Sequence, residues 1–298
     1  MMFGLCAFAG LACVFILAEV IYQVIDGASP AISHFGLGFL VHQDWKPNFG
    51  IFGAAAAIFG TVMSSLMALL IATPLGIAIG LCLSMMAPPP VRAVVGPLVE
   101  MLAAIPSVIV GFWGVVVLAP FVAQTLEPIF HTLFGWTGLF GAPQTTGLSV
   151  FTAGVGLTVM VLPIVSALSR DLFLTVPQDL KDGASALGAT RWEVIRGVVL
   201  PTTVSGVAAA TVLGLGRALG EAIAVTQMIG DGSGIHSLFL PGNSLASRVA
   251  NEFNYPQSKL DIPSLFYLAV ILLVIGLATS LGARWIANRF DVQRRLAR

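Results

Sequence analysis

The sequence predicts an all-α, polytopic membrane protein with about six membrane-spanning helices. Of its 298 residues, 57% are hydrophobic and only 9% are charged, whereas a soluble domain has roughly 25% charged residues. The mean hydropathy is +0.96. Apolar residues follow one another without interruption, as in residues 265–275, instead of alternating as they do in the strands of a membrane β-barrel. Together, these observations indicate a protein built from helices inside a lipid bilayer.

Six windows are long and apolar enough to cross a membrane, which requires about 20 residues each. They are residues 1–25, 53–86, 96–123, 148–170, 201–229 and 262–287. The second window would be about 50 Å long as a helix, so we expect it to tilt, to kink at Pro74 or to extend beyond the membrane. No linker or second domain is evident, and residues 1–298 are predicted to form a single transmembrane domain.

Lysine and arginine residues predict the orientation, because they are enriched in cytoplasmic loops. With both termini in the cytoplasm, the opposite side receives only Lys46, Arg248 and Lys259, and Arg217 falls inside a span. The cytoplasmic side then receives Arg92, Arg170, Lys181, Arg191, Arg196, Arg284, Arg289, Arg294, Arg295 and Arg298. We therefore expect both termini and the polar segment 171–200 to be cytoplasmic.

Residues 171–200 form a charged stretch between two apolar spans and are predicted to fold as a helix, a turn and a second short helix. The small residues Gly183 and Ala184 in the first helix permit close approach of another protein. Gly188 provides a turn that larger residues resist. Such a loop is typical of a docking surface.

The second short helix has its own start signal. Thr190 is followed three residues later by Glu193, which is the capping-box arrangement. Leu200 and Pro201 close the loop, and we expect Pro201 to begin the next span, where its missing N–H does no harm.

Two charged residues lie inside the fifth span. Arg217 and Glu221 are four residues apart, so they share one helix face and can pair. Charged residues within a membrane face the interior of the helix bundle or a water-filled cavity. Arg217 and Glu221 therefore predict either a polar patch on a transport pathway, in which Arg217 attracts an anion, or a structural ion pair.

A third polar feature precedes a proline in the third span. Pro106 is expected to kink the helix, because it lacks an N–H group. Glu100, near the cytoplasmic end, is interpreted as a residue that supports gating or coupling, or as an interfacial charge beside the kink.

The segment 182–201 resembles the coupling loop of ABC-transporter permeases, Glu-Ala-Ala-x3-Gly-x9-Ile-x-Leu-Pro. Ala184, Gly188, Leu200 and Pro201 match this pattern, whereas Asp182, Gly183 and Val198 replace Glu, Ala and Ile. The resemblance implies that the loop seats in a cleft of an ATPase subunit and transmits its closure to the spans.

Three further stretches make the resemblance narrower. Residues 100–107 (EMLAAIPS), 214–221 (GLGRALGE) and 241–253, which contains PGNS and ANEF, are similar to PstC-type permeases of bacterial phosphate ABC importers, and the similarity extends over residues 30–285. It implies the type I ABC importer permease fold in the cytoplasmic (inner) membrane. Permeases for molybdate, sulfate or an amino acid are the alternative.

The resemblance also implies the partners. They are a homologous PstA-type permease, a dimer of PstB-type ATPase subunits and a periplasmic or extracellular PstS-type phosphate-binding protein. Phosphate and membrane lipid are the other expected contacts, and no nucleic acid is expected. The sequence contains no Gly-x-x-x-x-Gly-Lys-Ser/Thr phosphate loop, which is the ATP-binding motif of such ATPases. We therefore expect no enzyme activity, no metal site and no cofactor in this chain, with ATP and Mg²⁺ on the partner ATPase.

Overall fold

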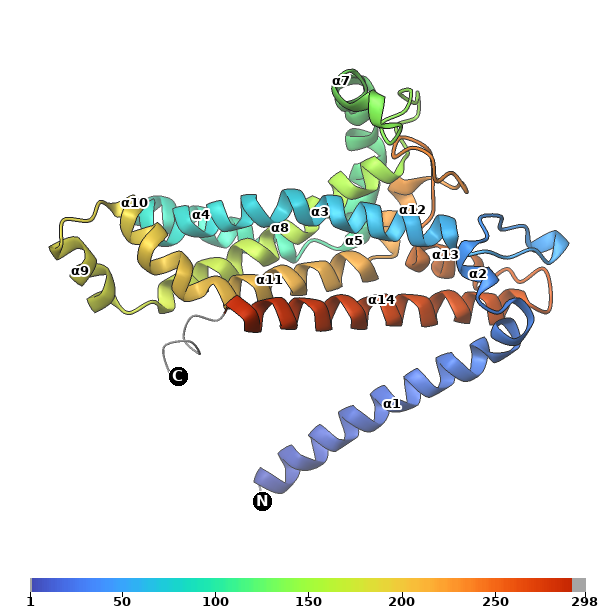
Figure 1. Ribbon diagram of the computed structural model, residues 1–298, viewed down its shortest axis with the longest axis horizontal. Helices are drawn as coiled ribbons and strands as arrows, with labels where there is room; N and C mark the ends of the chain where they lie inside the picture. Colours follow the sequence, from blue (N-terminus) through green and yellow to red (C-terminus); the bar gives the residue numbers. More distant parts are fainter. Residues whose placement is uncertain (1, 291–298) are drawn as a thin grey trace.

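The structure is a computed structural model that describes residues 2–290, and it is an elongated bundle of helices (Figure 1). Its described part contains no strand beyond an isolated bridge between Lys46 and Ile51. The α-helices are α1 (Met2–Phe35), α2 (Gly38–Val41), α3 (Ala55–Leu81), α4 (Pro89–Ala103), α5 (Ser107–Trp113), α6 (Ala119–Phe121), α7 (Glu127–Phe134), α8 (Val150–Thr175), α9 (Gln178–Ala186), α10 (Arg191–Val194), α11 (Leu200–Gly220), α12 (Ile223–Ile229), α13 (Leu245–Glu252) and α14 (Asp261–Phe290).

Short segments of other helix types join some of these helices. Five-residue π-helical segments occupy Cys82–Met86, Gly114–Leu118, Val122–Leu126 and Ile195–Val199, and 3₁₀ turns occupy Pro47–Phe49 and Gly135–Thr137. Because of these junctions, several α-helices form longer continuous helical rods.

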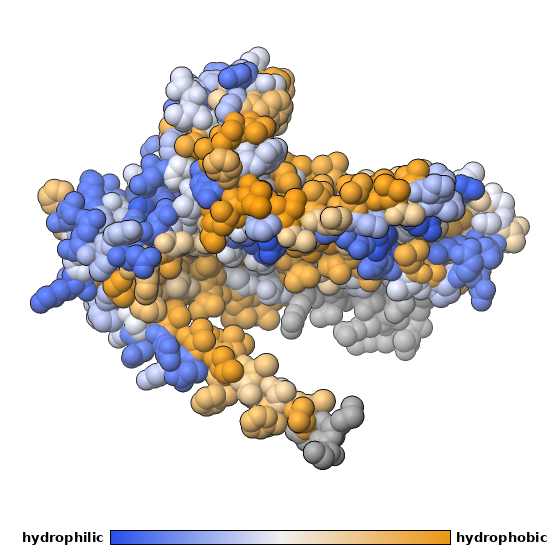
Figure 2. All heavy atoms as spheres, turned by 180° about the vertical axis from the view of Figure 1, so that it is seen from behind, coloured by the Kyte–Doolittle hydropathy of each residue, from blue (hydrophilic) through white to orange (hydrophobic). Residues whose placement is uncertain are grey.

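The described residues contain six helical segments that are long and apolar enough to cross a membrane, as the composition predicts. They are Leu5–Phe35, Ala55–Met86, Ser107–Thr137, Val150–Thr175, Arg191–Gly220 and Asp261–Gly282. The outer surface between the two polar ends of the bundle is mainly hydrophobic (Figure 2). The fold is therefore that of a multi-pass helical membrane protein.

The long helices α3, α8, α11 and α14 run along the length of the molecule (Figure 1). The most extensive packing joins α3 to α8. At one end lie α9 and α10, and at the other lie α2 and α13 (Figure 1). We refer to these as the α9 end and the α13 end.

The first helix is longer than the predicted span of residues 1–25. It continues to Phe35 and ends at Gly36, whose φ of 53° is left-handed, a common way to terminate a helix. The added turns are held by α14: Ala28 and Ala31 are fully buried, and Gly27 lies directly against the Phe266 ring. On the N-terminal side of this contact, α1 diverges from the bundle (Figure 1).

The predicted third and fifth spans are each interrupted. The third is divided between α4 and α5 by a non-helical break that ends at Pro106. The fifth is divided between α11 and α12 at Glu221 and Ala222. The segments after the two breaks, α5 and α12, pack on each other. Gly111 of α5 and Gly114, which follows α5, leave no room for a Cβ beside Gln227 and Met228.

The start of the fifth span also differs from the prediction. Pro201 does not begin the helix, because α10, the π-helical segment Ile195–Val199 and α11 form a continuous rod from Arg191 onward. A π-helical turn changes the hydrogen-bond pattern locally, and here it directly precedes the proline that lacks a donor. The second helix of the polar loop is therefore a rigid extension of a membrane-spanning helix.

Candidate functional site

At the α9 end, the polar loop folds as the sequence predicts. The helix α9 is followed by a turn in which Gly188 has a φ of 89°, a backbone conformation that glycine adopts without steric cost. The backbone N–H of Thr190 donates to the carboxylate of Glu193 at 2.7 Å, and the Thr190 hydroxyl accepts from the Glu193 N–H at 3.4 Å. The predicted capping box is confirmed.

The outward face of this loop carries apolar side chains with no cover. Leu187 at the turn is 91% exposed, and Leu180 and Trp192 are more than half exposed. A Cβ added at Gly183 would meet open space. Nothing within the described chain requires a small residue at this position.

The inward face of the loop is anchored on the ends of α8 and α11. Phe173 and Val199 are fully buried, and Val176 and Ile195 are nearly so; all four belong to one apolar cluster that also includes Leu81 of α3. Leu200 packs on the same cluster. The cluster joins both ends of the loop to α3, α8 and α11, and α9 contacts α10 and the π-helical segment Ile195–Val199.

Glu100 pairs with the end of α8. Its carboxylate lies 2.8 Å from a guanidinium nitrogen of Arg170, which also contacts the neighbouring Asp171 at 2.9 Å. Arg170 directly precedes the loop 171–200. The Glu100 side chain is half-exposed, and its role in gating, in coupling or as an interfacial charge stays a prediction.

Arg217 and Glu221 lie at the break between α11 and α12. Their nearest charged atoms are 3.8 Å apart, so they form the predicted pair without a hydrogen bond. The Glu221 carboxylate also accepts from the backbone N–H of Ala224 at 3.4 Å, at the start of α12. The Arg217 side chain is 41% exposed, whereas that of Glu221 is 10% exposed.

The structure brings Arg217 beside the other break. It lines a small cavity of about 20 Å³ with the last residues of α4 and the break that follows, Leu102, Ala103 and Ile105. Pro106 comes next in the chain. The two interrupted helices therefore meet at Arg217, which their separation in the sequence does not show.

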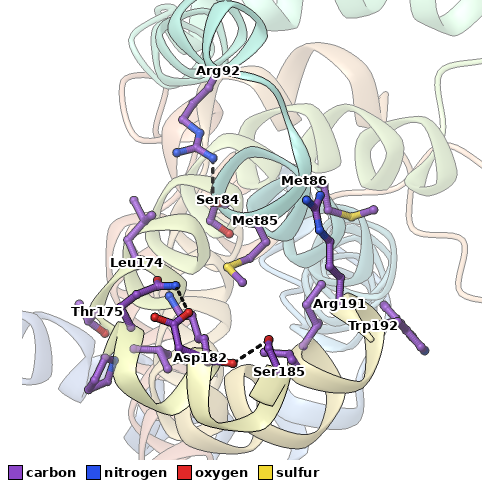
Figure 3. A pocket seen from close by; sticks show the side chains of 16 residues that line it. Ser84, Met85, Met86, Arg92, Leu174, Thr175, Asp182, Ser185, Arg191 and Trp192 are labelled. Carbon is purple, nitrogen blue, oxygen red and sulfur yellow. Dashed lines mark hydrogen bonds between the residues drawn. The ribbon is translucent and has the colours of Figure 1, made fainter. Parts of the chain in front are cut away.

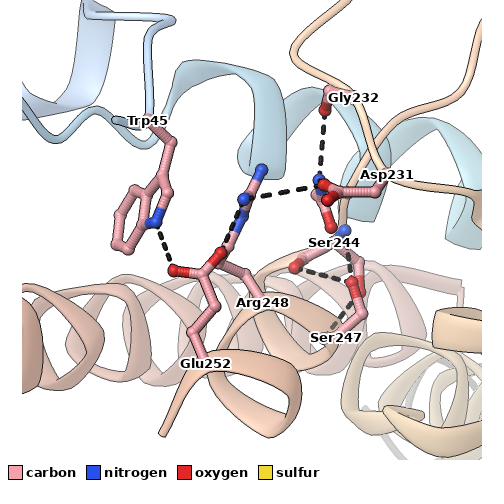
Figure 4. Close-up of polar contacts among 8 residues, drawn as sticks. Trp45, Asp231, Gly232, Ser244, Ser247, Arg248 and Glu252 are labelled. Carbon is pink, nitrogen blue, oxygen red and sulfur yellow. Dashed lines mark hydrogen bonds and ion pairs between the residues drawn. The ribbon is translucent and has the colours of Figure 1, made fainter. Parts of the chain in front are cut away.

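The α13 end contains a polar cluster that the sequence reasoning did not identify as a site (Figure 4). Arg248, only 8% exposed, pairs with Glu252 at 2.7 Å and with Asp231 at 3.7 Å. Its guanidinium lies 5.3 Å from the centre of the Trp45 ring. The indole N–H of Trp45 in turn donates to Glu252.

The same cluster secures the start of α13. Asn243 donates to the Asp231 carboxylate at 2.8 Å, and Ser244 and Ser247 form a capping box. The Leu245 N–H donates to the Thr61 hydroxyl of α3 at 2.8 Å. A signal was present in the sequence, since Arg248 and Glu252 are four residues apart, but their partners Trp45 and Asp231 come from distant segments.

Comparison with known proteins gives the family. Residues 72–292 match the family model described as "Binding-protein-dependent transport system inner membrane component". The chain is 41% identical to the "Phosphate transport system permease protein PstC" of Mesorhizobium japonicum, covering 96% of this chain and 88% of that protein. The chain belongs to the PstC-type permease family.

Other relatives agree with this assignment. The chain is 43% identical to the protein of the same name from Pasteurella multocida, over 87% of this chain and 82% of that one. It is also 41% identical to the protein named PstC 2 of Mycobacterium tuberculosis, over 80% and 74%.

Solved structures show the type I ABC importer permease fold. A subunit of the bacterial alginate ABC transporter, crystallised with an alginate-bound periplasmic protein, superimposes with a TM-score of 0.63 at 17% identity, over 95% of both chains. A subunit of the inward-facing methionine transporter MetNI gives a TM-score of 0.57 at 17% identity, over 78% of this chain and 94% of that one. At this identity, the likeness shows the fold alone, and it agrees with the predicted fold.

Proposed function

We propose that this chain is the permease subunit of an ATP-driven inorganic phosphate importer and forms half of its translocation pathway. The observation that carries the cargo assignment is the name shared by relatives at 41–43% identity over most of the chain. The coupling assignment is supported by the geometry of the loop at the α9 end.

Coupling requires a surface for an ATPase and a stiff connection to the spans, and the loop has the features of both. Leu180 and Leu187, both exposed, share one helix face with the open position at Gly183. The inward face of the loop is packed on α3, α8 and α11 through the buried cluster. ATP and Mg²⁺ are bound by a separate dimer of PstB-type ATPase subunits, whose closure displaces residues 178–197.

The pathway follows the face of α11 that carries Arg217. Gly216 and Gly220 on this helix face open space, and Leu213 is 59% exposed, so this face is available to a homologous PstA-type permease. Phosphate passes along the interface between the two permeases. Arg217 attracts the anion, and Glu221, which lies beside it, limits how tightly the anion is held.

The α13 end receives the loaded PstS-type phosphate-binding protein on the other side of the membrane. In this arrangement both termini and the α9 end lie in the cytoplasm, and the complex is located in the bacterial cytoplasmic membrane. The 10-to-3 division of basic residues supports this orientation.

The decisive experiment is uptake of radiolabelled phosphate by proteoliposomes that contain this chain with the partner permease, the ATPase subunits and the binding protein. We expect phosphate accumulation only when ATP is supplied on the ATPase side, with no inhibition by sulfate. An assembled complex that hydrolyses ATP but accumulates no phosphate would refute the cargo assignment and leave the permease assignment standing.

A second experiment tests the role of Arg217. In the Arg217→Gln variant, uptake should decrease by at least about tenfold, as expected when a charge-assisted contact is removed, while the complex still assembles. Loss of insertion or of pairing with the partner permease would instead show that the ion pair with Glu221 is structural.

A further inference from the structure

A cavity separates α9 from the end of α3 (Figure 3). It has a volume of about 810 Å³ and lies behind the coupling surface, on the side that faces the helix bundle. Its walls come from the π-helical end of α3, the start of α4, the end of α8, and the helices α9 and α10. The lining includes Arg92, Lys181, Asp182 and Arg191.

The charges around this cavity are not balanced. Three cations line it, from three different helices, whereas Asp182 is the single lining carboxylate. The Asp182 carboxylate already accepts a hydrogen bond from the Gln178 side chain at 2.9 Å. The cavity is therefore an electropositive space beside the coupling helix.

Lys181 is the informative residue, because it is only 9% exposed. Its ammonium group makes no ion pair or side-chain hydrogen bond within the described part of the chain. Lys181 lines the cavity, so its ammonium group can pair with an anion that enters this space. Such a charge-assisted contact is stronger than a neutral hydrogen bond.

Two arginines surround the same space with free donors. Arg92 donates through one terminal nitrogen to the carbonyl of Ser84 at 2.9 Å, which leaves its other N–H groups available. Arg191 forms no ion pair within the described residues and lines the cavity from α10. Guanidinium groups bind phosphate oxygens through paired hydrogen bonds.

The lining also has an apolar part. Met85, Met86, Leu174 and Trp192 contribute to the walls (Figure 3). The space accommodates a phosphate group together with water or with the organic part of a lipid head group.

From these features we infer that the cavity binds a phosphate group, supplied either by free inorganic phosphate or by an anionic phospholipid. The ligand bridges Lys181 and Arg191 on the coupling loop to Arg92 on α4. Such a bridge ties the loop to the bundle, so its occupancy sets how freely α9 moves with the ATPase. This site lies at the opposite end of α11 from Arg217, and its cytoplasmic location rests on the proposed function.

The test uses the complete transporter purified in detergent, with Lys181→Met, Arg191→Gln and, as a matched control, Arg196→Gln. Arg196 is an exposed cation on the same loop that does not line the cavity. One arm measures retention of phosphatidylglycerol against phosphatidylcholine by native mass spectrometry. The other measures binding of radiolabelled inorganic phosphate by equilibrium dialysis, without the binding protein and in the Arg217→Gln background.

We expect one arm to show a ligand whose affinity falls by about tenfold or more in Lys181→Met and Arg191→Gln, and remains unchanged in Arg196→Gln. If Lys181→Met does not assemble, the exposed Arg191 gives the result. Equal binding by all three variants would overturn the inference, as would a cross-link from residue 181 to an acidic segment of the ATPase. Because both arms measure binding rather than uptake, they are independent of the cargo assignment.

Discussion

The two ends of the molecule differ in how completely their polar groups are satisfied within the chain. At the α13 end, Arg248 is shared by two carboxylates and an indole ring, and Asp261 accepts from Gln257 and Ser258. At the α9 end, Lys181 has no ion pair among the described residues and lines a cavity with two arginines. The charged groups of the first end therefore satisfy one another, whereas the cations around this cavity do not.

Under the proposed function, this difference matches the roles of the two ends: the α13 end receives the binding protein, and the α9 end moves with the ATPase. A network whose members satisfy one another is rigid and costly to disrupt, which suits a surface that receives a folded partner without changing shape. An end whose cations have no ion pair among the described residues gains stability when an anion binds there. The following predictions test this contrast.

The largest effect is expected at the turn after α9. Proline fixes φ near −65°, whereas Gly188 has a φ of 89°, so Gly188→Pro cannot form the turn and ATP-coupled uptake should fall to background. Gly188→Asn is the matched control, because asparagine tolerates left-handed conformations, and it should retain most of the uptake. Normal uptake by the proline variant in the reconstituted complex would refute the coupling assignment.

The next effect tests the open position on the outward face. Gly183→Leu adds a side chain where this chain has open space, so the isolated permease should fold normally. Crowding at a packed interface costs about 1–3 kcal/mol, and ATPase association should weaken accordingly. Co-purification with the ATPase measures this, and Gly197→Leu, at another open position outside the motif, serves as control. Unchanged association of the Gly183 variant would place the ATPase elsewhere.

A smaller effect is expected at the α13 end. Arg248→Met leaves Glu252 and Asp231 without their cation and should lower the free energy of unfolding by about 2 kcal/mol, measured by denaturant unfolding in detergent. A double-mutant cycle with Glu252→Gln should give a coupling energy of about 0.5–3 kcal/mol. Additive effects would show that the cluster is not a connected network.

The smallest effect concerns the pair between α4 and α8. Glu100→Gln removes a half-exposed ion pair, which contributes about 1 kcal/mol or less to stability, so assembly should be unchanged. If the pair transmits loop movement, more ATP should be hydrolysed for each phosphate transported. Asp171→Asn is the control, since Asp171 also contacts Arg170 but lies on the same helix. An unchanged ratio in Glu100→Gln would make the pair a static surface contact.

Local signals were sufficient for much of the architecture. Long apolar windows located all six spans, because a bilayer imposes length and hydropathy on every helix that crosses it. The turn at Gly188 and the capping box at Thr190 were also predictable, since each depends on residues within a few positions of one another.

Only the tertiary structure decided where helices continue or stop. The extension of α1 to Phe35 depends on burial of Ala28 and Ala31 against α14. The break at Glu221 depends on close packing between α12 and Gly111 of α5. Such contacts join segments far apart in the sequence, so no local sequence pattern predicts them.

The same division holds for the candidate sites. The sequence by itself determined which residues are polar within an apolar chain, because the membrane makes each of them conspicuous: Arg217, Glu221, Glu100 and the loop 171–200. It did not determine their partners. Arg170 for Glu100, the α4–α5 break for Arg217 and the cavity around Lys181 arise from the packing of separate helices, because the energy of a buried charge depends on which groups the fold places around it.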